Sequence, residues 1–306
     1  MDVDHQRALE ALDVRLRTLL PEEYQDSYED VQPVSMGSAG LKYSLDGRVA
    51  WNEMWQTFCD LAMAGGPPHK GTLLEPGRRA AIEAQPARYT EVTGEIRRGI
   101  EMVTELPADL SPLPGWVRVT CLDRTMAGWL HRAIVMENVA ARRDYNEIDL
   151  PAAPAFRIEK EVKNVITVIA KTCHYWMGHM PYAQQRAIGV LFKTLDEESP
   201  LVEPPLPADG LDESTEALAV RMADRLQRET GLIASARRYA GWLGVECKSV
   251  RPAVWMMRAL VASNVLSRRE GTVLFVPVNP DSDPGGDRVL RSVATTRQLA
   301  AARNIV

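Results

Sequence analysis

An internal repeat is the feature that most constrains the fold of this chain. The segment beginning at Gly115 aligns without a gap to the segment beginning at Gly241, at a constant offset of 126 residues. Fourteen of 37 aligned positions are identical, whereas unrelated segments would share about two, so the chain is expected to contain two similar structural units. The identical pairs are Gly115/Gly241, Trp116/Trp242, Val119/Val245, Cys121/Cys247, Ala127/Ala253, Trp129/Trp255, Arg132/Arg258, Ala133/Ala259, Val135/Val261, Asn138/Asn264, Val139/Val265, Arg142/Arg268, Arg143/Arg269 and Pro151/Pro277.

Each copy begins with the pattern of a strand followed by a helix. Residues 116–121 and 242–247 alternate in the manner of short strands. Asp123 and Ser249 then occupy aligned positions, and both residue types are favoured as helix N-caps. Pro252 suits a first helical turn, where its missing N–H costs no hydrogen bond.

Each copy is expected to close with a second strand. The helices should end near Asn138 and Asn264, because asparagine tolerates the left-handed conformation that terminates helices. The closing strands are expected near 145–150 and 272–277, each followed by a proline. A strand–helix–strand unit with a short return is usually a parallel, right-handed crossover, and we expect that arrangement here.

The fold class predicted from these patterns is α/β, with two similar halves related by an approximate two-fold axis in one body. Each half has leading helices before its strand–helix–strand unit, and a unit of two strands is not stable alone. The predicted helices span 5–19, 49–64, 86–105, 157–177, 182–197 and 212–230. The predicted divisions are an N-terminal helix and loop (1–39), a first half (40–151), a second half (152–279) and a C-terminal loop and helix (280–306).

Composition and charge exclude several classes of protein. The 45% hydrophobic content describes a chain that can fill a core, and the formal net charge of −5 argues against general binding to nucleic acids or anionic membranes. No window approaches 18 uninterrupted apolar residues, and the first 20 residues lack the apolar core of a signal peptide. The four cysteines are scattered without a CxxC pair, so we expect free thiols and a cytoplasmic location.

The segment 172–181 holds the richest group of candidate functional residues. Two of the five histidines, a cysteine and two aromatic residues lie at the end of a predicted helix that Gly178 terminates. Imidazole and thiolate ligands suit zinc or iron, and the same groups suit acid–base or nucleophilic catalysis. A structural role is the alternative, because cysteine is often buried and a C-terminal histidine stabilises a helix. The predicted catalytic or metal-binding residues are Cys173, His174 and His179, with Tyr175 and Trp176 as an aromatic ligand-binding wall.

The first half presents histidine and lysine in a comparable place. His69 and Lys70 follow a glycine–proline loop after the helix expected over 49–64. A stiff loop of this kind suits proton transfer by His69 and anion binding by Lys70, although an ordinary helix-terminating loop is the alternative. We expect His69 to share one pocket with the His174–His179 segment.

Two weaker candidates complete the sequence reading. The segment 35–42, which contains two glycines, could offer backbone N–H groups to a phosphate, and a surface turn is the favoured alternative. Cys121 and Cys247 end equivalent strands just before helix N-termini, an edge where ligands bind in many α/β proteins. The favoured explanation is structural, namely a small buried residue that both halves require.

The predicted function is that of a cytoplasmic metabolic enzyme. It would act on a small polar or anionic molecule between the two halves, through histidine and cysteine acid–base chemistry or through a bound zinc or iron ion. The alternative is a non-catalytic assembly factor or partner subunit with an interaction surface rich in tryptophan and methionine, in which case a homo-oligomer or a protein partner is implied. Exposure of the tryptophans separates the two readings.

Overall fold

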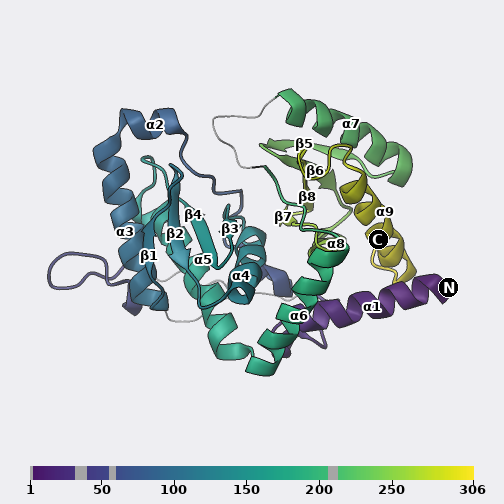
Figure 1. Cartoon of the computed structure of the whole chain (residues 1–306), viewed down its shortest axis with the longest axis horizontal. Coiled ribbons are helices and arrows are strands. Elements are labelled where there is room, and N and C mark those ends of the chain that lie inside the picture. The colour runs from purple at the N-terminus through teal and green to yellow at the C-terminus, as the bar shows by residue number, and fades with distance from the viewer. Residues whose placement is uncertain (1–2, 32–39, 55–59, 206–212) are drawn as a thin grey trace. The chain divides into compact units, whose positions relative to one another are not determined.

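The computed structural model describes residues 3–31, 40–54, 60–205 and 213–306. The chain divides into two compact units. The first unit comprises Gln32–Ala62 and Gly66–Gln185, and the second unit comprises Met1–Val31, Met63–Gly65 and Arg186–Val306. Each unit is built from helices around one four-stranded antiparallel sheet, so the protein belongs to the mixed α/β class (Figure 1).

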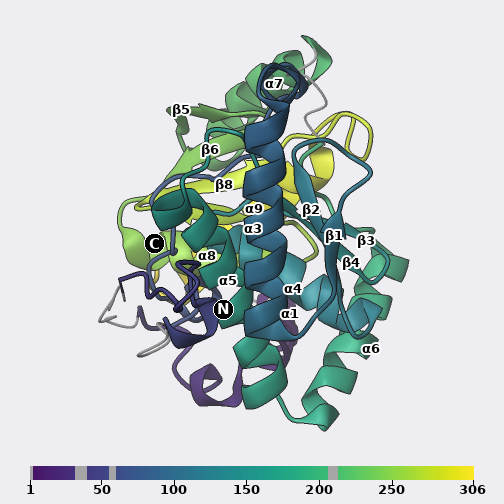
Figure 2. The same ribbon diagram turned by 90° about the vertical axis from the view of Figure 1, so that its left-hand side faces the viewer.

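The first unit contains one sheet with the strand order β1-β2-β4-β3. Figure 2 shows α3 in front of this part of the chain, and α3 packs against both α5 and the sheet. Val117 and Val119 of β2 are fully buried, as expected for the strand face that packs on the helices. The elements of the unit are α2 (Arg79–Ala84), α3 (Pro86–Thr104), β1 (Ala108–Leu110), β2 (Trp116–Thr120), α4 (Arg124–Met136), β3 (Arg142–Asp144), β4 (Glu147–Pro151) and α5 (Lys163–His174).

The second unit repeats this plan with the strand order β5-β6-β8-β7. Helix α9 packs against α7 and α8, and α1 packs against α8 and α9. Helix α6 (Tyr182–Glu198) begins in the first unit and ends in the second. The remaining elements of the second unit are α1 (Val3–Leu19), α7 (Glu213–Thr230), β5 (Ala234–Tyr239), β6 (Trp242–Glu246), α8 (Val250–Val261), β7 (Arg268–Glu270), β8 (Val273–Pro277) and α9 (Asp287–Ala302).

The strand pairing of the two sheets follows the offset of the sequence repeat. Trp116 pairs with Pro151 in the first sheet, and Trp242 pairs with Pro277 in the second. The correspondence extends beyond the repeated segment, because β1 and β5 also begin at the same offset. Both units therefore run helix, hairpin, helix, hairpin, helix.

The strands that flank the repeated helix are antiparallel, so the expected parallel crossover is wrong. β2 pairs with β4 in the antiparallel sense, and β6 pairs with β8 in the same way. The physical reason is an additional short strand after each helix. β3 and β7 lie at the sheet edge, and a hairpin then returns the chain as β4 or β8 into the position beside the first long strand.

The helix ends follow the predicted local chemistry with one exception. Asp123 caps α4, since its side chain accepts hydrogen bonds from the backbone N–H groups of Thr125 and Met126. Ser249 occupies the N-cap position of α8 but its side chain makes no capping hydrogen bond. Asn138 and Asn264 have φ values of 61° and 60°, the left-handed conformation predicted from the sequence.

The boundaries of two predicted segments differ from the structure. Residues 152–185, assigned above to the second half, belong to the first unit, where α5 packs on α3 and α4. The helix expected over 49–64 is not continuous. Its described parts are single 3-10 turns at Trp51–Glu53 and Ala62–Ala64, while residues 55–59 lie outside the described part of the chain.

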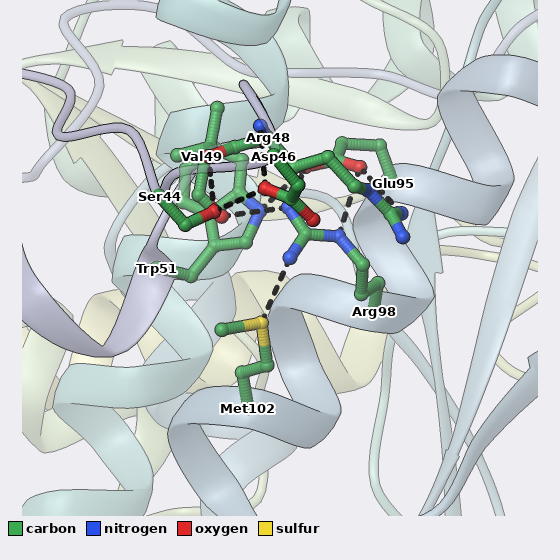
Figure 3. A network of polar contacts seen from close by, with 8 residues as sticks. All are labelled: Ser44, Asp46, Arg48, Val49, Trp51, Glu95, Arg98 and Met102. Atoms are coloured by element: carbon green, nitrogen blue, oxygen red, sulfur yellow. Dashed lines mark hydrogen bonds and ion pairs between the residues drawn. The ribbon is translucent and has the colours of Figure 1, made fainter.

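A polar network fixes the segment before the first of these turns to α3 (Figure 3). The indole N–H of Trp51 donates to Glu95 at 2.7 Å, and Arg98 bridges Glu95 and the backbone carbonyl of Val49. Trp51 is fully buried, so its indole nitrogen requires this partner. The hydrogen bond to Glu95 thus satisfies the buried indole N–H, and Trp51 anchors this segment on α3.

The tryptophans in the described part of the chain belong to the hydrophobic core. The six tryptophans in the described residues are all buried, at 7% exposure or less. Trp55 lies outside the described part of the chain. Among the described residues, no helix is long and apolar enough to cross a membrane.

Candidate functional site

The end of α5 brings His174 and His179 together. The helix continues into a π-helical turn over Tyr175–His179. The Nε2 atoms of the two histidines lie 3.1 Å apart, with ring centroids 4.8 Å apart and ring planes at 69°. The ring of Tyr175 packs on His179 at a centroid distance of 4.9 Å. Both histidines keep partial solvent exposure, so this pair is accessible to a ligand.

Cys173 does not join this pair. Its side chain is buried, and burial raises the pKa of its thiol well above the ordinary value, with a further contribution from Cys121. The thiol thus interacts electrostatically with that of Cys121, which follows β2, and adjacent residues on a helix point about 100° apart. Among the described residues, no group of three or more histidine, cysteine or acidic side chains is arranged to hold a metal. The structure thus brings His174 and His179 together without Cys173, and metal binding by this segment stays a prediction.

The predicted aromatic wall is core packing in part. Trp176 is 2% exposed, and its ring packs against Trp129 of α4 at a centroid distance of 5.6 Å. Tyr175 is also buried, although it contacts both histidines of the pair. Trp176 therefore packs the turn after α5 against α4, and the buried Tyr175 contacts the rings of both histidines.

His69 contacts the first turn of α5. Its Nε2 atom lies 3.0 Å from Oδ1 of Asn164, and its Nδ1 atom is buried. Burial lowers the pKa of His69 to about 4, with a smaller contribution from Lys171. The imidazole is consequently neutral near pH 7. Lys70 is bound through its backbone, which donates to the carbonyl of Glu137 and accepts from Asn138.

A buried ion pair holds this loop in place, and the sequence analysis missed it. The carboxylate of Glu137 is 2.9 Å from Nζ of Lys171, and both side chains are buried. The same carboxylate accepts hydrogen bonds of 2.8 Å from the backbone N–H groups of Ala62 and His69. Glu137 lies at the end of α4 and Lys171 lies in α5, so the pair joins two helices and the loop before them.

His69 and the histidine pair meet α5 at opposite ends. His69 contacts Asn164 in the first turn of the helix, whereas His174 is its last residue. Ten residues of α-helix separate those two positions by about 15 Å along the helix axis.

Equivalent positions of the two sheets differ in chemistry despite the common topology. In the first unit, Arg118 and Arg142 both bind Asp149, which is 1% exposed, in a charged network across β2, β3 and β4. At the position equivalent to Asp149 the second unit has Phe275, and Arg268 packs over that ring at 4.1 Å. Arg268 also binds Glu270 at 2.7 Å, with both side chains buried. These arginines have structural partners.

A cavity of about 310 Å³ lies in the second unit where β6 leads into α8. Its apolar lining residues are Pro252 and Met256 of α8, which are both buried, together with Leu232, Ala301 and Val306. Its rim carries charged side chains from two directions. The rim residues with polar side chains are Glu246, Lys248, Arg297 and Gln298.

The thiol of Cys247 also lines this cavity. The residue is partly exposed, whereas the equivalent Cys121 in the first unit is buried. Burial, with a smaller contribution from Glu246, raises the pKa of Cys247 to about 11. The thiol is therefore protonated near pH 7 and is a poor nucleophile. Cys121, Cys173 and Cys247 are free thiols, and Cys59 lies outside the described residues.

The chain was compared with protein-family models, curated proteins and solved structures. No protein-family model, no curated protein and no solved structure matches the chain. Of the weaker sequence candidates, most of the segment 35–42 lies outside the described residues.

Proposed function

We propose that the protein binds a small organic anion in the cavity of the second unit, between the end of β6 and the helices α8 and α9. The observation that carries this proposal is the cavity at the Cys247 strand end, about 310 Å³ in volume. Small-molecule sites typically measure about 300–1,000 Å³, and they combine an apolar lining with a few polar groups. A second hollow between α7 and β5, about 120 Å³, is smaller than this range.

The lining selects the chemical class of the ligand. Leu232, Ala301 and Val306, none of which is buried, offer an apolar surface to a hydrocarbon body, and the buried Pro252 and Met256 complete the apolar lining. Lys248 and Arg297 supply two cationic side chains at the rim, against the single acidic side chain of Glu246. Guanidinium and ammonium groups recognise carboxylate and phosphate oxygens. The proposed ligand is therefore a carboxylate or phosphate monoester that carries a short apolar chain.

The proposal retains the ligand class predicted from the sequence and assigns it to different residues. Cys247, with its raised pKa, lines the cavity as a neutral thiol, so the proposal includes no covalent step. The burial of the described tryptophans weighs against the alternative of a tryptophan-rich partner surface. We also propose a cytoplasmic location, which the free thiols of Cys121, Cys173 and Cys247 support.

We further propose that the two units arose by duplication of one helix–hairpin–helix–hairpin–helix unit. The gapless sequence repeat and the common strand order support this origin. The pairing of Trp116 with Pro151 and of Trp242 with Pro277 supports it independently, because pairing register is specified separately from strand order.

The binding proposal is tested with chemically matched probes. Straight-chain carboxylates from butanoate to octanoate, the corresponding alkyl phosphates and the neutral alcohols are titrated by calorimetry. Carboxylates or phosphates should bind and the alcohols should not, and the better of the two anion series identifies the headgroup. Arg297→Gln should weaken binding by about tenfold, the effect of one lost charge-assisted hydrogen bond.

Arg291→Gln is the matched control, since Arg291 is an exposed arginine of the same helix outside the cavity lining. The probes should also protect Cys247 from alkylation by a maleimide. Binding that is equal in the Arg297 and Arg291 variants, or no protection of Cys247, would overturn the proposed site.

A further inference from the structure

The π-helical turn at the end of α5 gives two histidines an arrangement that an α-helix does not give. Residues five apart on an α-helix point about 140° away from one another. A π-turn, with its i to i+5 hydrogen bonds, brings such residues onto one face, and single π-turns are often found at functional sites. The turn Tyr175–His179 thereby places His179 beside His174.

The distance between the two imidazoles fits coordination of one metal ion. Two histidine nitrogens bound to one tetrahedral zinc ion at 2.0–2.1 Å lie roughly 3.3 Å apart. The Nε2 atoms of His174 and His179 are 3.1 Å apart. The observed separation of the two Nε2 atoms is therefore within a few tenths of an ångström of the separation expected for a common ion.

We propose that His174 and His179 bind one divalent transition-metal ion through their Nε2 atoms. Imidazole nitrogen suits Zn²⁺, Cu²⁺ and Ni²⁺, whereas Mg²⁺ and Ca²⁺ prefer oxygen ligands. Water or a bound molecule completes the coordination, since the described residues supply two ligands here. The packing of Tyr175 on His179 holds the second imidazole in its bound orientation before the ion arrives.

The competing explanation is a hydrogen bond between two imidazoles, in which one ring donates its N–H to the other. That bond satisfies the same 3.1 Å distance without any ion. The two explanations differ in one respect that is measurable. A chelating pair binds a metal ion and loses that property when either imidazole is replaced, and a hydrogen-bonded pair does not bind one.

The test uses the full chain without a histidine tag. Zn²⁺ binding is measured by competition with a chelating dye, and the nitrogen hyperfine pattern of bound Cu²⁺ is measured by electron paramagnetic resonance. One ion per chain with two coordinated nitrogens is expected. His174→Gln and His179→Gln should each weaken Zn²⁺ binding at least tenfold, while His5→Gln in α1 is the matched control and should leave it unchanged.

A chemical measurement on the wild-type protein guards against variants that fail to fold. Diethylpyrocarbonate modification is mapped by mass spectrometry with and without Zn²⁺. Saturating Zn²⁺ should protect His174 and His179 and leave the modification of His5 unchanged. Equal binding in all three variants, absence of bound ion in the wild type, or unchanged modification of the pair would each overturn the proposal.

Discussion

Replacement of Glu137 tests whether the buried Glu137–Lys171 ion pair stabilises the first unit. The buried carboxylate has three partners, namely Nζ of Lys171 and the backbone N–H groups of Ala62 and His69. Glu137→Gln keeps the side-chain volume but removes the charge, and it leaves a buried lysine without its carboxylate. Breaking a buried ion pair on one side costs about 3–5 kcal/mol.

The complementary change Lys171→Met should cost less. Glu137 then keeps both backbone donors. The losses are the charge-assisted hydrogen bond to Glu137, about 1.5–3 kcal/mol, and the 3.5 Å contact of Nζ with the backbone carbonyl of Asp60. The double variant should be more stable than the sum of the two single losses, by a coupling energy of about 0.5–3 kcal/mol. A loss of this size is a large fraction of the total stability of a typical domain, about 5–15 kcal/mol.

Two assays separate a local effect from a global one. Urea unfolding followed by tryptophan fluorescence measures the free energy of unfolding, and amide hydrogen exchange over residues 60–70 measures the loop that Glu137 binds. Exchange should accelerate at Ala62 and His69. Glu159→Gln, at an exposed acidic residue of the same unit, is the control and should stay within about 0.5 kcal/mol. A loss in Glu137→Gln no greater than in this control would refute the reasoning.

Three further outcomes are expected. Burial holds the pKa of His69 near 4, below its unfolded value of 6.5, so the unfolded state binds more protons than the folded state between these pH values. The free energy of unfolding should therefore fall as the pH drops through this window. His69→Gln should reduce that fall when the urea midpoint is measured as a function of pH. Maleimide labelling of the native protein at pH 7 should be slow at Cys247 and faster as the pH approaches its pKa of about 11, whereas the denatured, unreduced protein should titrate four thiols. Asn264→Ala should lower the free energy of unfolding in urea by roughly 2–3 kcal/mol, because alanine is strained at a positive φ and the hydrogen bonds to Asp196 and Ser199 are lost. Asn264→Gly loses the same hydrogen bonds without the strain and should cost about 1 kcal/mol less. Equal costs for the two variants would contradict the strain argument.

The local patterns that were predictable from sequence depend on few, strongly constrained residues. Asn138 and Asn264 adopt the left-handed conformation because asparagine tolerates it, and Asp123 caps its helix as its side chain allows. The edge strands were not predictable. β1 and β3 have three residues each, which is too short for a period-two pattern, and β3 decides the antiparallel arrangement.

The candidate site was predictable where chain neighbours determine it. His174 and His179 meet because one helical turn joins them, and the sequence places both at a helix end. The structure does not bring Cys173 to this pair, because Cys173 and the adjacent His174 point in different directions from the helix. The cavity at Cys247 is lined in part by α9, about 50 residues further along the chain. Local sequence patterns do not predict a contact between residues so far apart in the chain.

The methyl group of Met256 provides the most direct test of the central claim, that the second unit holds a small organic anion. Met256 lines the cavity, and its neighbour Met257 is buried outside the lining. In protein labelled with ¹³C at the methionine methyl groups, a titration with hexanoate and with hexyl phosphate is followed by NMR. The account predicts a saturable shift of the Met256 signal with at least one anion, little change at Met257, and loss of that shift in Arg297→Gln. A Met256 signal that stays in place at saturating concentrations of both anions would contradict it.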